Sequence, residues 1–446
     1  MNARRHLLQV TAATALAAAL PKAFAARQDR FAPYRGQTVV MNIPEHPHFD
    51  AMLPLLPEFT HETGIKVELA RERMLRLRPL QLGELTKPQG AFDLVCYVVT
   101  WKGEYVSKKL LHPLAPFFAN PQLADPVFDM HDIVPGYLQN IGLVGGPKGY
   151  LPGPGAELYG LPYGAETSIL AYRRDLFATY GFQPPKTYTE LQALLVPLRE
   201  KTGIGALTSR GLSGHQSVHA WLTHLNPLGG KMFDAHWNTA FQFEAGTGAL
   251  QLLRDIVETG PEGIPKFGQA EMIRSFLQGD AAMYLDASVI FGPVRNPAMS
   301  KVDGKVSYVL HPRGVKASAQ SGGLGLAIAK NSTRANAAFL LMQWLTSKAQ
   351  DKAVAKLGGV PNRMSTLSDA DLVRQYPEYI TLKEQLRYAD PDWRPIIPPW
   401  DDIITGPLGA AIFQGLSGTR PPAQALSDIV PRVTEIMRAA GYPTQH

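Results

Sequence analysis

Several apolar runs of this 446-residue sequence are followed at once by aromatic and short polar side chains. In open α/β sheets ligands bind beyond the carboxyl ends of strands, so contacts are expected at such positions. Aromatic planes pack on the apolar faces of a sugar ring, and polar groups pair with its hydroxyls, since an unpaired buried hydroxyl costs about 1–3 kcal/mol. The pattern is compatible with a site for a small polar molecule, a polyhydroxylated one included. The candidates that follow strands are Asn42, Glu45 and His46, then Tyr97, Thr100 and Trp101, and later Asp286 and Ser288.

Glu166 is an isolated acid in an apolar stretch. The short runs 161–163 and 168–172 flank it, and Tyr163 is a second candidate contact in the same stretch. A buried carboxylate needs hydrogen-bond donors. Hydroxyls of a ligand and backbone amides of the protein are both possible donors, so a binding role and a structural role stay open for Glu166. Asp286 has the same two readings, as a ligand contact or as a cap of the following turn.

Motifs for metal binding or catalysis are weak. His46 and His48 lie two residues apart beside Glu45, without a third ligand at a recognisable spacing. The glycine strings GLVGGPKG and GGLGLA lack the spacing and the following lysine of a phosphate-binding loop. We therefore expect no metal, no cofactor and no catalysis by this chain.

Length and periodicity predict an α/β protein with at least two domains, because a single core stops growing at roughly 250–300 residues. A helix that carries Met52 and Phe59 should end at Gly64, and a capping box formed by Thr187 and Glu190 should open another helix. Strands are expected at 38–43, 65–69, 92–99, 281–285, 307–310 and 325–329, and further helices at 269–277 and 334–345.

The first 25 residues have the features of an export signal. Arg4 and Arg5 precede an alanine-rich apolar run, and residues 23–25 have the small-x-small form of a signal-peptidase site. The arginine pair favours the twin-arginine route, with the Sec route as the alternative. No later apolar run reaches the roughly 18–20 residues of a membrane span.

Charge and cysteine content narrow the function classes. Removal of residues 1–25 takes away three basic residues and no acid, so the formal charge falls from +6 to +3. No basic cluster stands out, which argues against nucleic acid as a partner. Cys96 is the single cysteine, so an intrachain disulfide is excluded, and its apolar surroundings predict a buried strand residue.

Five segments of the sequence match the motifs of one known family, in that family's order. They are residues 158–191, 276–288, 321–350, 358–363 and 413–426. With these segments the chain resembles the family 1 extracellular solute-binding proteins, the maltose-binding type that serves carbohydrate ABC importers. Each motif alone is degenerate, but together they cover nearly all of the chain beyond residue 25.

This resemblance implies an α/β, two-lobed periplasmic-binding-protein fold of type II with an interlobe hinge. Residues 1–25 would form the signal peptide, residues 27–166 and 312–366 lobe 1, and residues 167–311 and 367–446 lobe 2. The resemblance also adds candidate ligand contacts from the second lobe and the hinge, with the two glycines as backbone donors: Ser217, His219, Trp221, Gly322, Gly323, Trp400 and Asp401.

The implied function is capture of a sugar, oligosaccharide or polyol by hinge closure, and its delivery to the membrane permease of an ABC importer. The chain would act in the periplasm as a monomer. Thr100 and Trp101 stand where relatives specialised for maltose carry an acid and an arginine, which argues against maltose itself. Few arginines lie among the candidates, which argues against phosphate. An exported carbohydrate-active or cofactor enzyme, and a ligand-binding partner of a sensor, are the alternatives.

Overall fold

The computed structural model describes residues 30–146 and 153–444, so the predicted signal peptide lies outside the described residues. In the described part nine strands form one mixed sheet in the order β2-β1-β3-β10-β6-β8-β7, with β9 beside β6 and β11 beside β10. Their bounds are β1 Thr38–Pro44, β2 Lys66–Glu72, β3 Leu94–Val98, β6 Leu161–Arg173, β7 Gly205–Thr208, β8 Ala281–Ala287, β9 Val306–Val309, β10 Ala319–Ile328 and β11 Ala389–Asp390.

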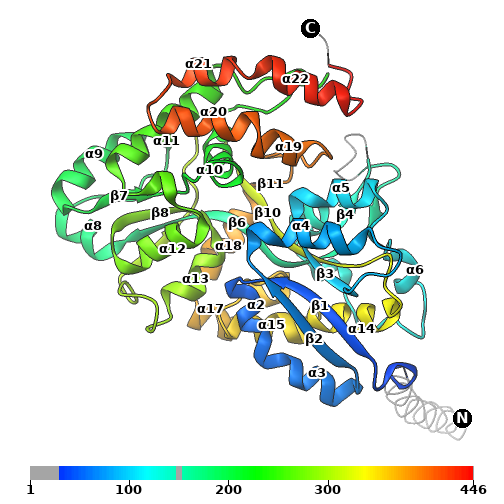
Figure 1. Cartoon of the computed structure of the whole chain (residues 1–446). Helices are drawn as coiled ribbons and strands as arrows, with labels where there is room; N and C mark the ends of the chain where they lie inside the picture. The colour runs from blue at the N-terminus through cyan, green and yellow to red at the C-terminus, as the bar shows by residue number, and fades with distance from the viewer. Residues whose placement is uncertain (1–29, 147–152, 445–446) are drawn as a thin grey trace, which may run out of the picture.

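Strand β6 connects the two lobes of this α/β fold. Its first part pairs with β10 as far as Thr167 opposite Ser321, and its last part pairs with β8 from Ser168 opposite Ala287. Figure 1 shows β6 and β10 in the centre, between the β1–β3 side and the β7–β8 side. Glu166 therefore lies at the passage between lobes. The predicted change of lobe at 166/167 is next to this change of strand partner, and the full set of lobe boundaries stays a prediction.

Lobe 1 is built on β2, β1 and β3. Its core places Val39 and Met41 of β1 with Phe339 and Leu341 of α14, the helix predicted at 334–345. The apolar stripe of that helix is buried, as core packing of an amphipathic face requires. The helices here are α2 Pro47–Met52, α3 Leu56–Thr63, α4 Met74–Leu85, α5 Lys102–Ser107, α6 Ala115–Phe118, α7 Pro135–Tyr137, α14 Ala335–Leu345, α15 Lys348–Lys356 and α16 Met364–Leu367, with β4 Leu143–Val144 and β5 Glu157–Leu158 as a small hairpin.

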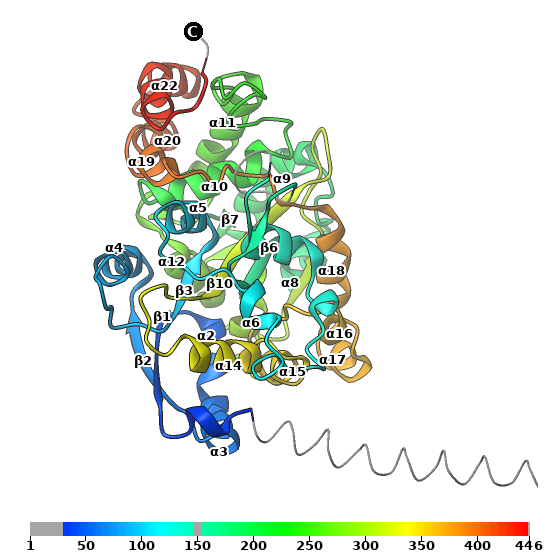
Figure 2. The same ribbon diagram turned by 90° about the vertical axis from the view of Figure 1, so that its right-hand side faces the viewer.

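Lobe 2 is built on β7, β8 and the end of β6. Leu191 and Leu195 of α9 pack with Leu207 of β7. Figure 2 shows the last helices of the chain beside α11 at one end of the molecule, and α14 and α15 at the other. The remaining helices are α8 Arg174–Tyr180, α9 Tyr188–Thr202, α10 His215–Leu225, α11 Glu244–Thr259, α12 Gln269–Gln278, α13 Phe291–Val294, α17 Ala370–Gln375, α18 Glu378–Gln385, α19 Trp400–Thr405, α20 Pro407–Leu416, α21 Pro422–Ser427 and α22 Val430–Ala439.

The local signals are largely confirmed. Thr187 and Glu190 form the predicted capping box of α9, and Gly64 ends α3 in the left-handed conformation, with φ 73°. The helix expected before Gly64 is divided into α2, a 3-10 turn and α3, because prolines at 54 and 57 begin the later segments.

The runs 161–163 and 168–172 that flank Glu166 belong to one strand of 13 residues, β6. One strand prediction is wrong in extent. Strand β10 begins at Ala319 instead of Gly325. Gly322 and Gly323 therefore lie inside a strand, with Gly322 opposite Glu166 and Gly323 opposite Ala165.

Candidate functional site

Glu166 is nearly buried where β6 passes between the lobes, with 6% of its surface exposed. It pairs across the sheet with Gly322, which has no side chain to cover it. Nε2 of His46, the N-cap residue of α2, lies 3.3 Å from Glu166 Oε1. That oxygen nevertheless accepts no well-directed hydrogen bond from the described residues. The carboxylate therefore retains capacity for a further donor, such as a hydroxyl.

Arg210 and Asp286 form a buried ion pair in lobe 2. Arg210 follows β7, and Asp286 lies on β8. The guanidinium donates twice to the carboxylate, with Nε 2.9 Å from Oδ2 and Nη2 2.5 Å from Oδ1. Burial opposes ionisation of Asp286, but the adjacent Arg210 charge outweighs it and holds the pKa of Asp286 well below its usual range. Both groups are thus charged at neutral pH.

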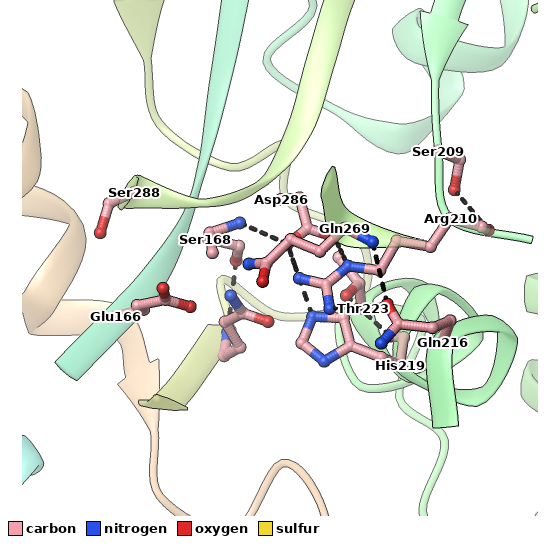
Figure 3. A network of polar contacts seen from close by, with 12 residues as sticks. Glu166, Ser168, Ser209, Arg210, Gln216, His219, Thr223, Gln269, Asp286 and Ser288 are labelled. Atoms are coloured by element: carbon pink, nitrogen blue, oxygen red, sulfur yellow. Dashed lines mark hydrogen bonds and ion pairs between the residues drawn. The ribbon is translucent and has the colours of Figure 1, made fainter. Parts of the chain in front are cut away.

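His219 of α10 faces this pair, as Figure 3 shows. Its Nε2 lies 3.6 Å from Asp286 Oδ1 and makes no hydrogen bond in the described part of the protein. Burial, with the nearby Arg210 charge, lowers the pKa of His219 to about 4. The imidazole is therefore neutral at physiological pH. One edge of it packs against Trp393, with ring centroids 5.3 Å apart.

Arg394 is a second buried cation, 4% exposed. Its guanidinium carbon lies 4.5 Å from the centre of the Trp393 ring. No hydrogen bond or ion pair links Arg394 to any other described residue, and its Nε is buried without a partner. Burial, then the Arg210 charge, lowers the pKa of Arg394 to about 9, and Glu166 partly opposes this shift. A Cβ on Gly322 would lie 2.9 Å from Arg394 Nη2, so the glycine leaves room for the guanidinium.

Further buried polar atoms without partners lie on the segments around this crossing. They include Thr100 Oγ1, Tyr137 Oη and Gln320 Oε1. Burial raises the pKa of Tyr137, and the charge of Glu166 adds to the shift, so these two groups are close. Buried polar atoms are normally paired, and exceptions concentrate where a ligand or water belongs. A molecule with several hydroxyls could donate to Glu166 and accept from Arg394 at the same time.

Comparison with known proteins identifies the family. The model of the bacterial extracellular solute-binding protein family matches residues 45–352. The chain belongs to this family. A mannitol-binding protein of Pseudomonas aeruginosa is 28% identical over 405 residues, which cover 86% of this chain and 88% of that protein. A probable amino-acid ABC transporter periplasmic-binding protein of Sinorhizobium fredii is 25% identical and covers 99% of each chain.

Solved structures agree with the family fold. A solute-binding protein of Agrobacterium radiobacter in complex with ribitol matches with a TM-score of 0.81 and 25% identity, over 90% of this chain and 99% of that one. A protein of Agrobacterium vitis with bound D-mannitol matches with a TM-score of 0.79 and 25% identity, over 92% and 100%. This solute-binding protein therefore has the two-lobed fold of the maltose-binding type.

Five of the candidate residues lie close together where β6 passes between the lobes. Glu166 and His46 adjoin there, while His219 and Asp286 adjoin Arg210. Ser288 lies next to the crossing, where its Oγ accepts from the Thr167 amide at 3.4 Å. Thr100 carries an unpaired buried hydroxyl on the 3-10 turn after β3 and is a further candidate.

Other candidates make their polar contacts within the protein. Asn42 donates to Ala70 O and accepts from Gln81, Tyr97 donates to Ile141 O at 2.7 Å, and Ser217 bonds Gly214 O. Glu45 is exposed. Asp401 pairs with Arg78, with 2.8 Å between the charged atoms. These contacts favour structural roles, because they use the groups that a ligand would need.

The aromatic candidates are mostly core residues. Trp221 is fully buried and donates to Gly246 O, and Trp400 is 2% exposed. Tyr163 packs edge-on against His48, with ring centroids 4.4 Å apart. Trp101 lies beside Tyr105 in the same cluster of buried side chains. A ring after a strand can face the core or the ligand, and here burial favours the core.

Arg210, Arg394 and Trp393 were missed from the sequence. Arg210 comes just after β7, a strand that was not predicted. Had β7 been recognised, Arg210 would have been selected as Asp286 was, because both residues lie at the carboxyl end of a strand. Trp393 and Arg394 lie in an irregular segment, so no periodic pattern marks them. Two arginines therefore lie beside candidates that include no arginine themselves. Arg210 is neutralised by Asp286, however, and Glu166 is a counter-charge near Arg394.

Within residues 30–146 and 153–444, no group of three or more His, Cys, Asp and Glu side chains is arranged to hold a metal ion. No helix in the same described ranges combines the length and the apolar character needed to cross a bilayer.

Proposed function

We propose that this chain is the substrate-binding component of an ABC importer and that it captures a small neutral polyol or sugar between its lobes. The observation that carries the proposal is the buried pair of unsatisfied groups, the Glu166 carboxylate and the Arg394 guanidinium. Their opposite charges suit hydroxyls, which donate and accept. The relatives named for mannitol and for erythritol or L-threitol, and the structures holding ribitol and D-mannitol, support the same ligand class.

The aromatic rings near the site offer few open faces for stacking, which favours a short ligand over an oligosaccharide. Pyranose rings bind by stacking on open aromatic planes, and extended sugar chains need several of them. Trp221 and Trp400 are buried in the core, and the guanidinium of Arg394 covers one face of Trp393. Hydrogen-bonding groups remain abundant at the site. An open-chain polyol of four to six carbons uses such groups fully and needs little stacking.

Transport would follow from hinge closure. Ligand groups bound by both lobes favour the closed state, by an amount set by the difference in affinity between the two states. The closed form would then dock on membrane permease subunits. Export by the N-terminal signal, along the twin-arginine route, would place the monomer in the periplasm. The cycle requires no chemical step by this chain.

The test is a thermal-shift and calorimetry panel on protein that begins at Ala26. The panel holds erythritol, ribitol, mannitol, monosaccharides and maltose, with amino acids added because of the name of the Sinorhizobium relative. We expect at least one polyol to raise the melting temperature and to bind with a single site. A panel in which amino acids bind and polyols do not would contradict the proposed ligand class.

Two variants test the residues that carry the proposal. A charged hydrogen bond contributes about 1.5–3 kcal/mol, so Glu166→Gln and Arg394→Met should each weaken binding by roughly tenfold to hundredfold. Glu200→Gln on the exposed face of α9 is the control and should bind like wild type. Unchanged affinity in both Glu166→Gln and Arg394→Met would remove this pair from the site.

A further inference from the structure

An ion pair joins a helix of lobe 1 to a helix of lobe 2. Arg78 lies on α4, and Asp401 lies on α19, with Nη1 2.8 Å from Oδ2. Helix α4 is anchored in lobe 1, since its Gln81 donates to Asn42 of β1 and to the carbonyl of Cys96 on β3. Helix α19 packs beside α10 and α20 of lobe 2. Separation of the lobes would break the Arg78–Asp401 contact.

The two partners are held unequally. Arg78 is fixed within its own lobe by Glu104, with Nε 3.0 Å and Nη2 2.9 Å from Oε2. In the described part of the chain Asp401 pairs with no second cation. Burial raises the pKa of Asp401, and Arg78 opposes this shift. On opening, Arg78 would keep Glu104, whereas Asp401 would exchange its partner for water.

The lobes also touch next to this pair. Gly103, at the start of α5 in lobe 1, lies so near the carbonyl of Ile396 that an added Cβ would be 2.7 Å from the oxygen. The backbones meet closely there, so the pair is partly shielded. The side chains of Arg78 and Asp401 are 22% and 25% exposed. Partial shielding makes such a pair stronger than one in open solvent, but still sensitive to salt.

We propose that Arg78 and Asp401 form an interlobe latch that sets how much of the protein is closed. They are positioning residues that act through closure, not ligand contacts. The apparent dissociation constant equals the intrinsic value divided by the competent fraction, so a change in the closed population changes affinity. This consequence for affinity rests on the proposed binding function, whereas the closed population of the ligand-free protein does not.

The test measures lobe separation without ligand. Dyes are attached at Glu68→Cys on β2 and Gln192→Cys on α9, both exposed, and Cys96 is too buried to react. Energy transfer then reports the closed fraction. Asp401→Asn should lower the closed-to-open ratio about fivefold, equivalent to about 1 kcal/mol. In wild type the ratio should fall as sodium chloride is raised, and Asp401→Asn should lose most of that dependence.

Three further variants separate the latch from general damage. Asp401→Glu should restore most of the closed fraction, and the neighbouring exposed Asp402→Asn should behave as wild type. Gly103→Ala should open the lobes by steric contact while its salt dependence remains, because the ion pair is intact. An unchanged closed fraction in Asp401→Asn, or equal effects of Asp401→Asn and Asp402→Asn, would overturn the latch. A latch confirmed by Asp401→Asn, together with a wild-type protein that binds no polyol of the panel, would leave the latch standing and refute the proposed function.

Discussion

Loss of Arg210 should destabilise lobe 2 severely. The side chains of Arg210 and Asp286 are only 4% and 3% exposed, and the guanidinium makes two hydrogen bonds to the carboxylate. Arg210→Met would leave the Asp286 carboxyl buried without its counter-charge, and breaking a buried pair in this way costs about 3–5 kcal/mol. Urea unfolding, followed by tryptophan fluorescence and by circular dichroism, measures the loss.

A double-mutant cycle separates the pair from the rest of the site. Asp286→Asn alone leaves a buried guanidinium with Gln216 as its remaining partner, at 3.3 Å, so it should also destabilise. The double variant Arg210→Met/Asp286→Asn carries neither unpaired charge, so its loss should be smaller than the sum of the single losses. Arg374→Met removes an ion pair in which both side chains are 75% exposed and should cost less than about 0.5 kcal/mol. A loss below about 1 kcal/mol in Arg210→Met, or additive single losses, would refute the reasoning.

Two other outcomes follow from the same region. Burial lowers the pKa of His219 and His224 to about 4 and that of His311 to about 3, from an ordinary 6.5, so the unfolded chain binds protons first as the pH falls. The contribution of these histidines to the free energy of unfolding is complete above about pH 6.5 and decreases towards pH 4, by on the order of 3 kcal/mol per histidine. Denaturant unfolding at pH 7, 5.5 and 4.5 should therefore give a steadily smaller free energy of unfolding. A value that does not change with pH would contradict this prediction. Gly322→Ala would place a Cβ 2.9 Å from Arg394 Nη2, so polyol affinity should fall at least tenfold in calorimetry, with the melting temperature lowered less than in Arg210→Met.

Elements whose signals lie within a few neighbouring residues could be predicted from the sequence. The capping box of α9, the left-handed glycine after α3 and the buried stripe of α14 each involve residues within a few positions of one another. The start of β10 could not be predicted in this way. Ala319 to Leu324 become a strand because β6 and β11 lie alongside them, and these partners are remote in sequence.

The residues of the candidate site also divide into those with a local sequence signal and those without one. An acid in an apolar stretch pointed to Glu166, and its burial without a hydrogen-bond partner keeps it a leading candidate. Aromatic residues after strands were poor guides, since the sequence does not show which face a ring will occupy. Arg394 gave no local signal at all. Arg394 is a candidate because of the space beside Gly322, the contact with the Trp393 ring and the pKa shift caused by Arg210. These three residues lie in different parts of the fold.

Asp401 shows how a remote partner decides the role of a residue. The resemblance to the family made it a candidate ligand contact together with Trp400, but its carboxylate pairs with Arg78 of the opposite lobe. Affinity in a two-lobed protein has two sources, the contacts made in the closed state and the free energy of closing itself. Substitution of Glu166 acts on the first source, and substitution of Asp401 acts on the second. A variant series that measures binding and lobe separation together would therefore assign each residue to its source, whereas binding constants alone would assign both to ligand contact.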